Sequence, residues 1–310
     1  MDIASILLTV TGLCLFEAVS SLDNAIVNAD VLSTMGERAR RWFLTWGLLT
    51  AVFVIRGFLP WLIVWAATPS IGPAGAFTAA FSGDPRLMAA IGTSSPVLLM
   101  GGGTFLVFLF FHWLFLEEKH FGLRGERYIR KKGVWFYAVV SILLAAIVWF
   151  ALGMHPLVAF GAVVGSTAFF IVHGFRQNAE GRERSLTDRS ISDVSKIFYL
   201  EVIDATFSVD GVLGAFAFTL SVPLIILGNG LGAFVVREIT VGNIDRIRQY
   251  IYLKNGAMYS ILALGTVMIL KSFGMEIPGY LPPLITFAIV GYFLLKSRRA
   301  PPAAPRDPEE

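Results

Sequence analysis

The sequence FEAVSSLDNAI at residues 16–26 has a counterpart further along the chain, IDATFSVDGVL at residues 203–213, and each places acids inside an apolar segment. About 20 apolar residues suffice for a helix to cross the hydrocarbon of a bilayer. A charged side chain at that depth costs roughly 2.5 to 3.5 kcal/mol on insertion scales, so a cation, a proton or an arginine must compensate it. The two stretches therefore indicate a membrane protein whose function depends on buried acids.

The composition of the 310-residue chain agrees with a membrane location, because 55% of its residues are apolar and only 15% are charged. Its mean hydropathy of +0.69 reflects more hydrocarbon than one water-soluble core would bury. The apolar segments predict an all-α, polytopic membrane protein of about nine transmembrane helices. These lie near residues 4–32, 42–59, 96–116, 133–152, 156–175, 197–220, 222–238, 250–272 and 281–296. Pro156 and Pro223 predict tight turns between two pairs of them.

The basic residues predict the orientation, because cytoplasmic loops hold an excess of Lys and Arg. All but three of the 25 Lys and Arg fall in five segments, at residues 38–41, 117–132, 176–196, 237–254 and 296–306. With nine spans these segments share one face, so we expect the N-terminus outside and the C-terminus inside a bacterial inner membrane. The exceptions are Arg56, Arg86 and Lys271. The net charge of +3 therefore reflects topology and predicts no nucleic-acid partner.

Two further matches follow the first in the same order, which indicates an internal repeat. AVFVIRG at 51–57 matches GAFVVRE at 232–238, and LMGGGTF at 99–105 more weakly matches LKNGAMY at 253–259. Five crossings separate the first span from the sixth, so the two copies run in opposite directions. Inverted repeats are common in secondary transporters, whose sites lie near the bilayer midplane.

This repeat divides the chain into a first copy, a connection, a second copy and a tail. They correspond to residues 1–152 (spans one to four), 153–196 (a connecting span and cytoplasmic loop), 197–297 (spans six to nine) and 298–310 (a disordered cytoplasmic tail). Residues 61–95, rich in Pro, Gly and Ser, are expected to form one long external connection. The glycines at 101–103 lie inside an apolar span without a following Lys-Ser or Lys-Thr, so they predict close helix packing or a hinge and not a phosphate loop.

The intramembrane acids and one amide make up the candidate metal site. Its expected ligands are Glu17, Asp23, Asn24, Glu201, Asp204 and Asp210. Glu201 and Asp204 share a helix face, whereas Asp204 and Asp210, six positions apart, lie about 120° apart around a helix. The latter two converge only if the helix is locally unwound or if each faces a different neighbour. Ser, Asn and Gly residues in both motifs are typical of an unwound helix, which would expose carbonyls to an ion.

All these ligands offer oxygen, and no histidine accompanies them, so the site favours Mn²⁺, Ca²⁺ or Mg²⁺ over zinc or copper. SLDNA at 21–25, DATFSVDG at 204–211 and KGVWFYA at 132–138 resemble the TerC family of integral membrane proteins, named for tellurium resistance and related to LysE-type exporters. The resemblance covers most of the chain. It implies divalent-metal efflux, chiefly of manganese, with ligand roles for Asp23, Asn24, Asp204 and Asp210. Gly211, where the family often has a polar residue, and the long 61–95 connection depart from its pattern.

The sequence thus predicts a secondary exporter of a divalent cation, chiefly Mn²⁺, in exchange for protons, with no resident cofactor and no enzymatic activity. Its expected partners are the transported metal and the lipid bilayer. Arg56 and Arg237 are expected either to extend toward the interface or to hold site carboxylates when the cation is absent. Two alternatives stay open: a non-transporting membrane scaffold in metal or tellurite stress, and an intramembrane aspartyl protease that uses Asp23 and Asp210. The protease would lack the Gly-x-Gly-Asp string expected before its second aspartate.

Overall fold

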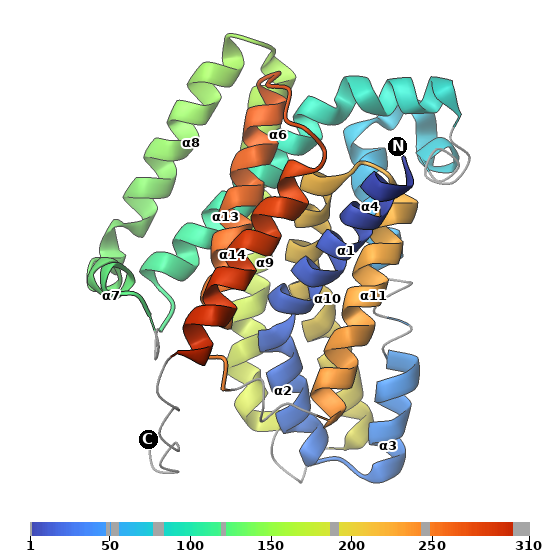
Figure 1. Cartoon of the computed structure of the whole chain (residues 1–310), viewed down its shortest axis with the longest axis vertical. Coiled ribbons are helices and arrows are strands. Elements are labelled where there is room, and N and C mark those ends of the chain that lie inside the picture. Colours follow the sequence, from blue (N-terminus) through green and yellow to red (C-terminus); the bar gives the residue numbers. More distant parts are fainter. Residues whose placement is uncertain are drawn as a thin grey trace.

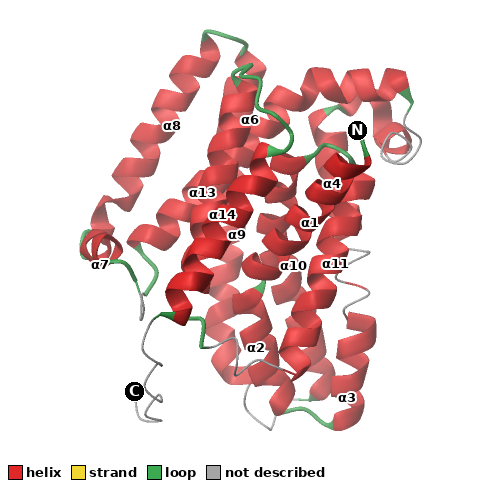
Figure 2. Cartoon of the chain, viewed as in Figure 1, coloured by secondary structure: helices red, strands yellow, loops and turns green. Residues whose placement is uncertain are grey.

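The computed structural model describes residues 2–47, 50, 56–76, 84–118, 122–186, 192–242 and 249–299. These residues are almost entirely helical, and no strand occurs among them. Long helices run roughly side by side along the molecule (Figure 1). The described loops gather mainly toward the two ends of this bundle (Figure 2). The all-α fold class is therefore confirmed.

Most of the predicted spans overlap described helices, with somewhat different bounds, whereas much of the span predicted at 42–59 and most of the predicted tail at 298–310 lie outside the described residues. The helices are α1 (Ile3–Ser20), α2 (Leu22–Ser33), α3 (Glu37–Trp42), α4 (Arg56–Ala67), α6 (Pro85–Phe115), α7 (Arg124–Arg130), α8 (Phe136–Leu152), α9 (Pro156–Leu186), α10 (Asp193–Phe218), α11 (Val222–Gly242), α13 (Leu253–Ser272) and α14 (Leu281–Arg298). A π-helical turn, η1 (Phe43–Gly47), follows α3. The 3-10 turn η3 (Pro69–Ile71) follows α4, and the 3-10 turn η4 (Gly133–Trp135) precedes α8. Both proline turns are confirmed, since α9 begins at Pro156 and Pro223 lies in the first turn of α11.

Five stretches of the described helices are long and apolar enough to cross a membrane. They are Ile3–Ser20, Ala89–Phe115, Gly133–Leu152, Pro156–Asn178 and Leu253–Ser272. The outer side of α8 carries large exposed apolar side chains, among them Ile142, Trp149 and Phe150. An exposed apolar surface of this kind is expected where a helix faces lipid. The chain is therefore a membrane protein with several apolar helices.

Helix α6 forms the centre of the bundle, and its glycines let two neighbours approach closely. A Cβ atom on Gly103 would lie 2.8 Å from the carbonyl oxygen of Gly265 in α13. On another side of α6, a Cβ atom on Gly161 of α9 would lie 2.7 Å from the carbonyl oxygen of Val97. Small residues at such crossings are typical of helix packing in membranes. The prediction that the glycines at 101–103 serve close packing is confirmed.

The expected long connection at 61–95 is wrong at both of its ends. Residues 61–67 continue α4, and residues 85–95 form the first turns of α6; residues 77–83 lie outside the described part of the chain. Proline does not prevent helix formation in or beside this segment. Pro60 and Pro96 lie inside helices, and Pro85 occupies the first turn of α6, where no amide donor is needed.

Candidate functional site

The first acidic motif interrupts a helix, as predicted. Helix α1 ends at Ser20 and α2 begins at Leu22, and the intervening Ser21 adopts φ −88° and ψ 4°. The Ser21 hydroxyl donates a hydrogen bond of 2.7 Å to Oε1 of Glu17, and its amide donates to the Glu17 carbonyl at 3.0 Å. The break between α1 and α2 therefore directs the Ser21 hydroxyl toward the buried carboxylate of Glu17, one helical turn earlier.

The second acidic motif is not unwound, which corrects the expectation for this half of the chain. Helix α10 runs without a break through Asp204 and Asp210. The hydroxyl of Ser208 donates to the carbonyl of Asp204 at 2.6 Å, so the helix absorbs this polar group by itself. The two aspartates consequently face different neighbours, which was the other arrangement that their spacing allowed.

Arg56, at the start of α4, joins two of the predicted site acids. Its Nε and Nη2 donate to Oε1 of Glu17 at 3.0 and 2.7 Å, and its Nη1 donates to Oδ2 of Asp204 at 3.4 Å. Arg56 is 3% exposed and Glu17 is 1% exposed, so this contact is withdrawn from water. One guanidinium thus holds acids from α1 and α10 together.

Asp210 has a different partner, Arg176 in α9. Its Oδ2 accepts a hydrogen bond from Nη2 of Arg176 at 2.7 Å, and both side chains are largely buried. A role for this arginine was not predicted, because Arg176 follows an apolar span directly and falls within the basic segment 176–196. Among the three cations outside the five basic segments, Arg56 was the one that marked the site.

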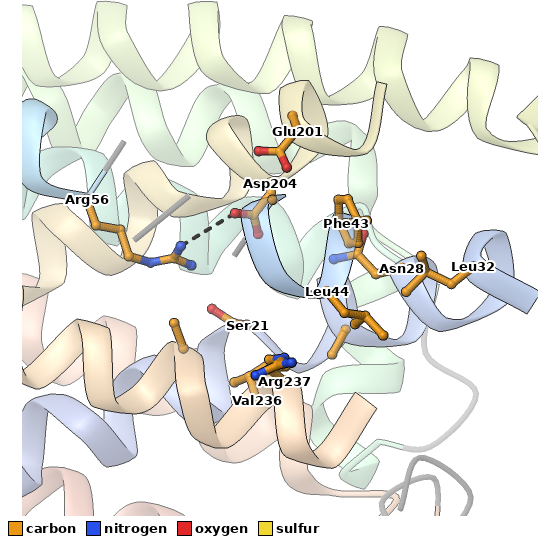
Figure 3. Close-up of a pocket in the computed structure, with 13 residues that line it drawn as sticks. Ser21, Asn28, Leu32, Phe43, Leu44, Arg56, Glu201, Asp204, Val236 and Arg237 are labelled. Carbon is orange, nitrogen blue, oxygen red and sulfur yellow. Dashed lines mark hydrogen bonds and ion pairs between the residues drawn. The ribbon is translucent and has the colours of Figure 1, made fainter. Parts of the chain in front are cut away.

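A cavity of about 60 Å³ adjoins the Arg56 cluster, between α2, η1, α10 and α11. Glu201 and Asp204 point into it from the same face of α10, and Asn28 points in from α2 (Figure 3). Both carboxylate oxygens of Glu201 are buried, and neither has a hydrogen-bond partner among the described residues. A Cβ atom on Gly47 would collide with Oε1 of Glu201, so the absence of a side chain there makes room for this carboxylate.

Apolar packing and two polar contacts close this cavity at the end where α2 finishes and α10 begins. Val31, Leu32, Met35, Phe43 and Leu200 form a buried apolar cluster there. Below it, Nζ of Lys196 donates to Oγ1 of Thr34 at 2.8 Å, and the amide of Gly36 donates to Oδ2 of Asp193 at 3.2 Å. The acids of the cavity are therefore separated from that end of the molecule by packed side chains.

The structure brings together three of the six predicted ligands. Glu17, Asp204 and Glu201 lie around Arg56 and the cavity, whereas Asp210 is held by Arg176. Asp23 and Asn24 lie in the first turn of α2, and their side chains are outside what the structure describes. In the described part of the chain, no group of three or more His, Cys, Asp or Glu side chains is arranged to hold a metal ion.

Arg237 of α11 also lines the cavity. Its Nη1 lies 3.9 Å from Oε1 of the neighbouring Glu238, which is a long contact between partly exposed groups. Among the described residues, Arg56 therefore contacts two of the predicted site carboxylates, Glu17 and Asp204. Arg237 instead contacts Glu238, which is not one of the predicted ligands.

The helices and the buried ion pairs define a polytopic membrane protein with ionised groups inside the bundle. Residues 22–301 match a family described as "Protein of unknown function (DUF475)". Since the match covers most of the chain, this protein belongs to the DUF475 family. No curated protein and no solved structure matches the chain.

Proposed function

We propose that this protein is a secondary exporter of a divalent metal cation, chiefly Mn²⁺, that returns protons in exchange. The observation that carries this proposal is the carboxylate of Glu201, whose two buried oxygens have no partner among the described residues. A buried anion without compensation is costly, and a cation in the adjoining cavity would offset that cost. Asp204 and Asn28 offer further oxygen ligands in the same cavity, which suits a hard divalent ion.

The contacts of Arg56 suggest how the negative charges of the site are compensated when no metal cation is bound. Its contact with Asp204 is 3.4 Å long, beyond the usual 2.7 to 3.2 Å for such hydrogen bonds, whereas both contacts with Glu17 are shorter. Asp204 is therefore the acid that Arg56 releases most easily. On entry of a cation, Asp204 turns to the ion beside Glu201, while Glu17 keeps Arg56.

The size of the cavity and the crowding of acids support the exchange step. A cavity of about 60 Å³ has room for a small ion with about one ligating water, since one water occupies about 30 Å³ of liquid. Like charges disfavour joint ionisation, so neighbouring carboxylates without a metal take up protons that a divalent ion displaces. The sequence carries no Walker-type nucleotide-binding motif, so ion exchange is the energy source in this proposal.

The proposal includes nine spans in a bacterial inner membrane, with the N-terminus outside and the C-terminus in the cytoplasm, and two inverted copies that rock about the site. Support comes from the arrangement of the matched segments. The acidic motifs of α1 and α10 meet through Arg56, and the glycine-containing segments of α6 and α13 belong to helices that cross closely. The aspartyl protease alternative is disfavoured, because an Asp210 that pairs with Arg176 is poorly placed to share a proton with Asp23.

The test is metal accumulation in cells that express the wild-type protein or single variants, with Mn²⁺, Ca²⁺, Mg²⁺ and Zn²⁺ measured by mass spectrometry. Wild type is expected to lower cellular manganese, and Glu201→Gln and Asp204→Asn are expected to abolish this effect. Glu37→Gln is the matched control, since Glu37 is an exposed acid of α3. Unchanged metal content for every cation with wild type, or full export by Glu201→Gln, would refute the proposal.

A further inference from the structure

Helix α7 and the turn η4 form a cationic and aromatic surface at one end of α8, which we call the α7 surface. Arg124, Arg127, Lys131 and Lys132 are its exposed cations. Val134 and Trp135 follow directly and are 85% and 60% exposed. The α7 surface thus places four positive charges beside two exposed apolar side chains.

The acids near this surface have other partners. Glu118 pairs with Arg130 at 2.6 Å, and Glu117 pairs with Lys254. Glu126, the acid within α7, is 2% exposed and accepts hydrogen bonds from the amide of Leu123 at 2.9 Å and from Nδ2 of Asn255 at 2.9 and 2.8 Å. These local carboxylates therefore do not need the four exposed cations for their own compensation.

The contacts of Glu126 also fix how α7 is turned. Asn255 belongs to α13, so the buried carboxylate attaches α7 to the bundle. Ile129 packs on the same side, against the cluster of Phe110, Trp113 and Leu114. Glu126 and Ile129 face the protein, whereas Arg124 and Arg127 face outward. The direction of the cationic face is thus a property of the fold.

The position along α8 places the α7 surface at the level of lipid headgroups. The apolar span of α8 begins at Gly133, directly after Lys132. In Figure 1 α7 is seen nearly end-on at the foot of α8, so its axis runs across the axis of that span. A basic helix that lies across the end of a membrane span, with aromatic side chains beside it, is typical of a helix in the membrane interface.

We propose that the α7 surface binds the phosphate headgroups of anionic phospholipids, while Val134 and Trp135 insert among their acyl chains. The arginines provide planar donor pairs that match phosphate oxygens, and the lysines provide point charges. Each Lys or Arg near an anionic membrane surface strengthens binding about fivefold. The proposal concerns a lipid site on the outside of the bundle and is independent of the transported species.

The experiment titrates the purified full-length protein, in neutral detergent, with phosphatidylglycerol or phosphatidylcholine and counts bound lipids by native mass spectrometry. Wild type is expected to bind phosphatidylglycerol more tightly than phosphatidylcholine. The variant Arg124→Gln/Arg127→Gln/Lys131→Gln is expected to lose on the order of 10²-fold in apparent affinity for phosphatidylglycerol, with little change for phosphatidylcholine. These exposed positions tolerate glutamine, which a melting curve of each variant checks.

The matched control removes the same charge from three exposed cations elsewhere in the chain, as Arg86→Gln/Arg298→Gln/Arg299→Gln. This control is expected to bind phosphatidylglycerol as wild type does. Equal loss in both triple variants would show a general effect of net charge and would overturn the proposal. Equal affinity of wild type for the two lipids would also overturn it, as would displacement of phosphatidylglycerol by equimolar inorganic phosphate, which would indicate a site for soluble anions.

Discussion

Arg56 carries one positive charge but contacts two acids that the membrane interior would otherwise leave uncompensated. Its shorter contacts go to Glu17, which is 1% exposed, and its longer contact goes to Asp204. Removal of one partner from a buried pair costs about 3–5 kcal/mol, because the remaining charge has no compensation. Loss of either Arg56 or Glu17 is therefore expected to destabilise the folded protein.

We predict that Arg56→Gln destabilises the protein by about 3–5 kcal/mol and that Glu17→Gln in the same chain recovers part of this loss. The recovery is expected because the second substitution removes the uncompensated carboxylate. Chemical unfolding in mixed micelles, with both single variants and the double variant, measures the coupling. Strictly additive losses would show that Arg56 and Glu17 do not interact in the folded protein.

The side chain of Glu17 leaves no room for a side chain at position 211, which is a glycine. A Cβ atom at this position would collide with Oε2 of Glu17. We predict that Gly211→Ala destabilises the protein by about 1–3 kcal/mol through overpacking. Gly291→Ala in α14 is the control, because nothing lies within 4 Å of the added atom, and alanine there is expected to be neutral or to stabilise by up to about 1 kcal/mol. Equal changes in the free energy of unfolding for Gly211→Ala and Gly291→Ala would contradict the predicted collision with Glu17.

The break between α1 and α2 depends on which serine hydroxyl reaches Glu17. Ser21 donates to the carboxylate at 2.7 Å, whereas Ser20 donates to the backbone carbonyl of Glu17 at 3.3 Å. We predict that Ser21→Ala costs about 1.5–3 kcal/mol, the usual contribution of a hydrogen bond to a charged group. Ser20→Ala, one residue away, is expected to change stability by less than about 0.5 kcal/mol. Similar decreases in melting temperature for both variants would show that the hydrogen bond from Ser21 to the Glu17 carboxylate does not stabilise the break between α1 and α2.

The sequence predicted helices better than it predicted where they end or bend. Apolar runs and Pro156 located most of the spans and a tight turn, because length and hydropathy dominate in a membrane. The segment 61–95 was misread as a loop because of its Pro, Gly and Ser content, although Pro85 lies in the first turn of α6, where proline is compatible with a helix. The continuity of α10 was also unpredictable, because Ser208 satisfies its hydroxyl within the helix. Local composition alone does not tell this bonding from unwinding.

The candidate site was predictable in its acids but not in its pairing. Buried carboxylates in two matched motifs indicated that Glu17 and Asp204 belong together, and the structure joins them through Arg56. The assignment of Asp210 to Arg176 depends on how α9 packs against α10, which no spacing in the sequence encodes. The most useful sequence signal was the position of Arg56, which lies within an apolar segment and outside the five basic segments. Such an arginine is expected to pair with a buried acid.

Lys271, another exception to that distribution, bears on how the whole chain crosses the membrane. Its Nζ donates to the carbonyl of Ala217 at 3.0 Å, near the end of α10. A cation is stabilised at a helix C-terminus by the unpaired carbonyls and the helix dipole. Lys271 therefore has a local reason to lie on the face with few basic residues, and it does not contradict the orientation proposed from the other cations.

The proposed topology makes a prediction about two distant points of the molecule. In the described part of the chain, five helices separate Tyr128 in α7 from Met275, namely α8, α9, α10, α11 and α13. In Figure 1 α7 lies at the lower end of α8, whereas the turn between α13 and α14 lies toward the upper end of α8. Because an odd number of crossings changes the side of the membrane, the two residues are expected on opposite faces. Tyr128 is 61% exposed and Met275 is 54% exposed, so a cysteine at either position is accessible to reagent.

We predict that, in a Cys14→Ser background, Met275→Cys reacts with a membrane-impermeant maleimide in intact spheroplasts, whereas Tyr128→Cys reacts only after lysis. Cys14 is the only native cysteine, so its replacement leaves one thiol per variant. Reaction of both thiols after lysis controls for accessibility. Reaction of both in intact spheroplasts would require an even number of crossings between them. One of the five helices would then fail to span, the basic segments on either side of it would lie on opposite faces, and the inverted repeat with its shared midplane site would have to be abandoned.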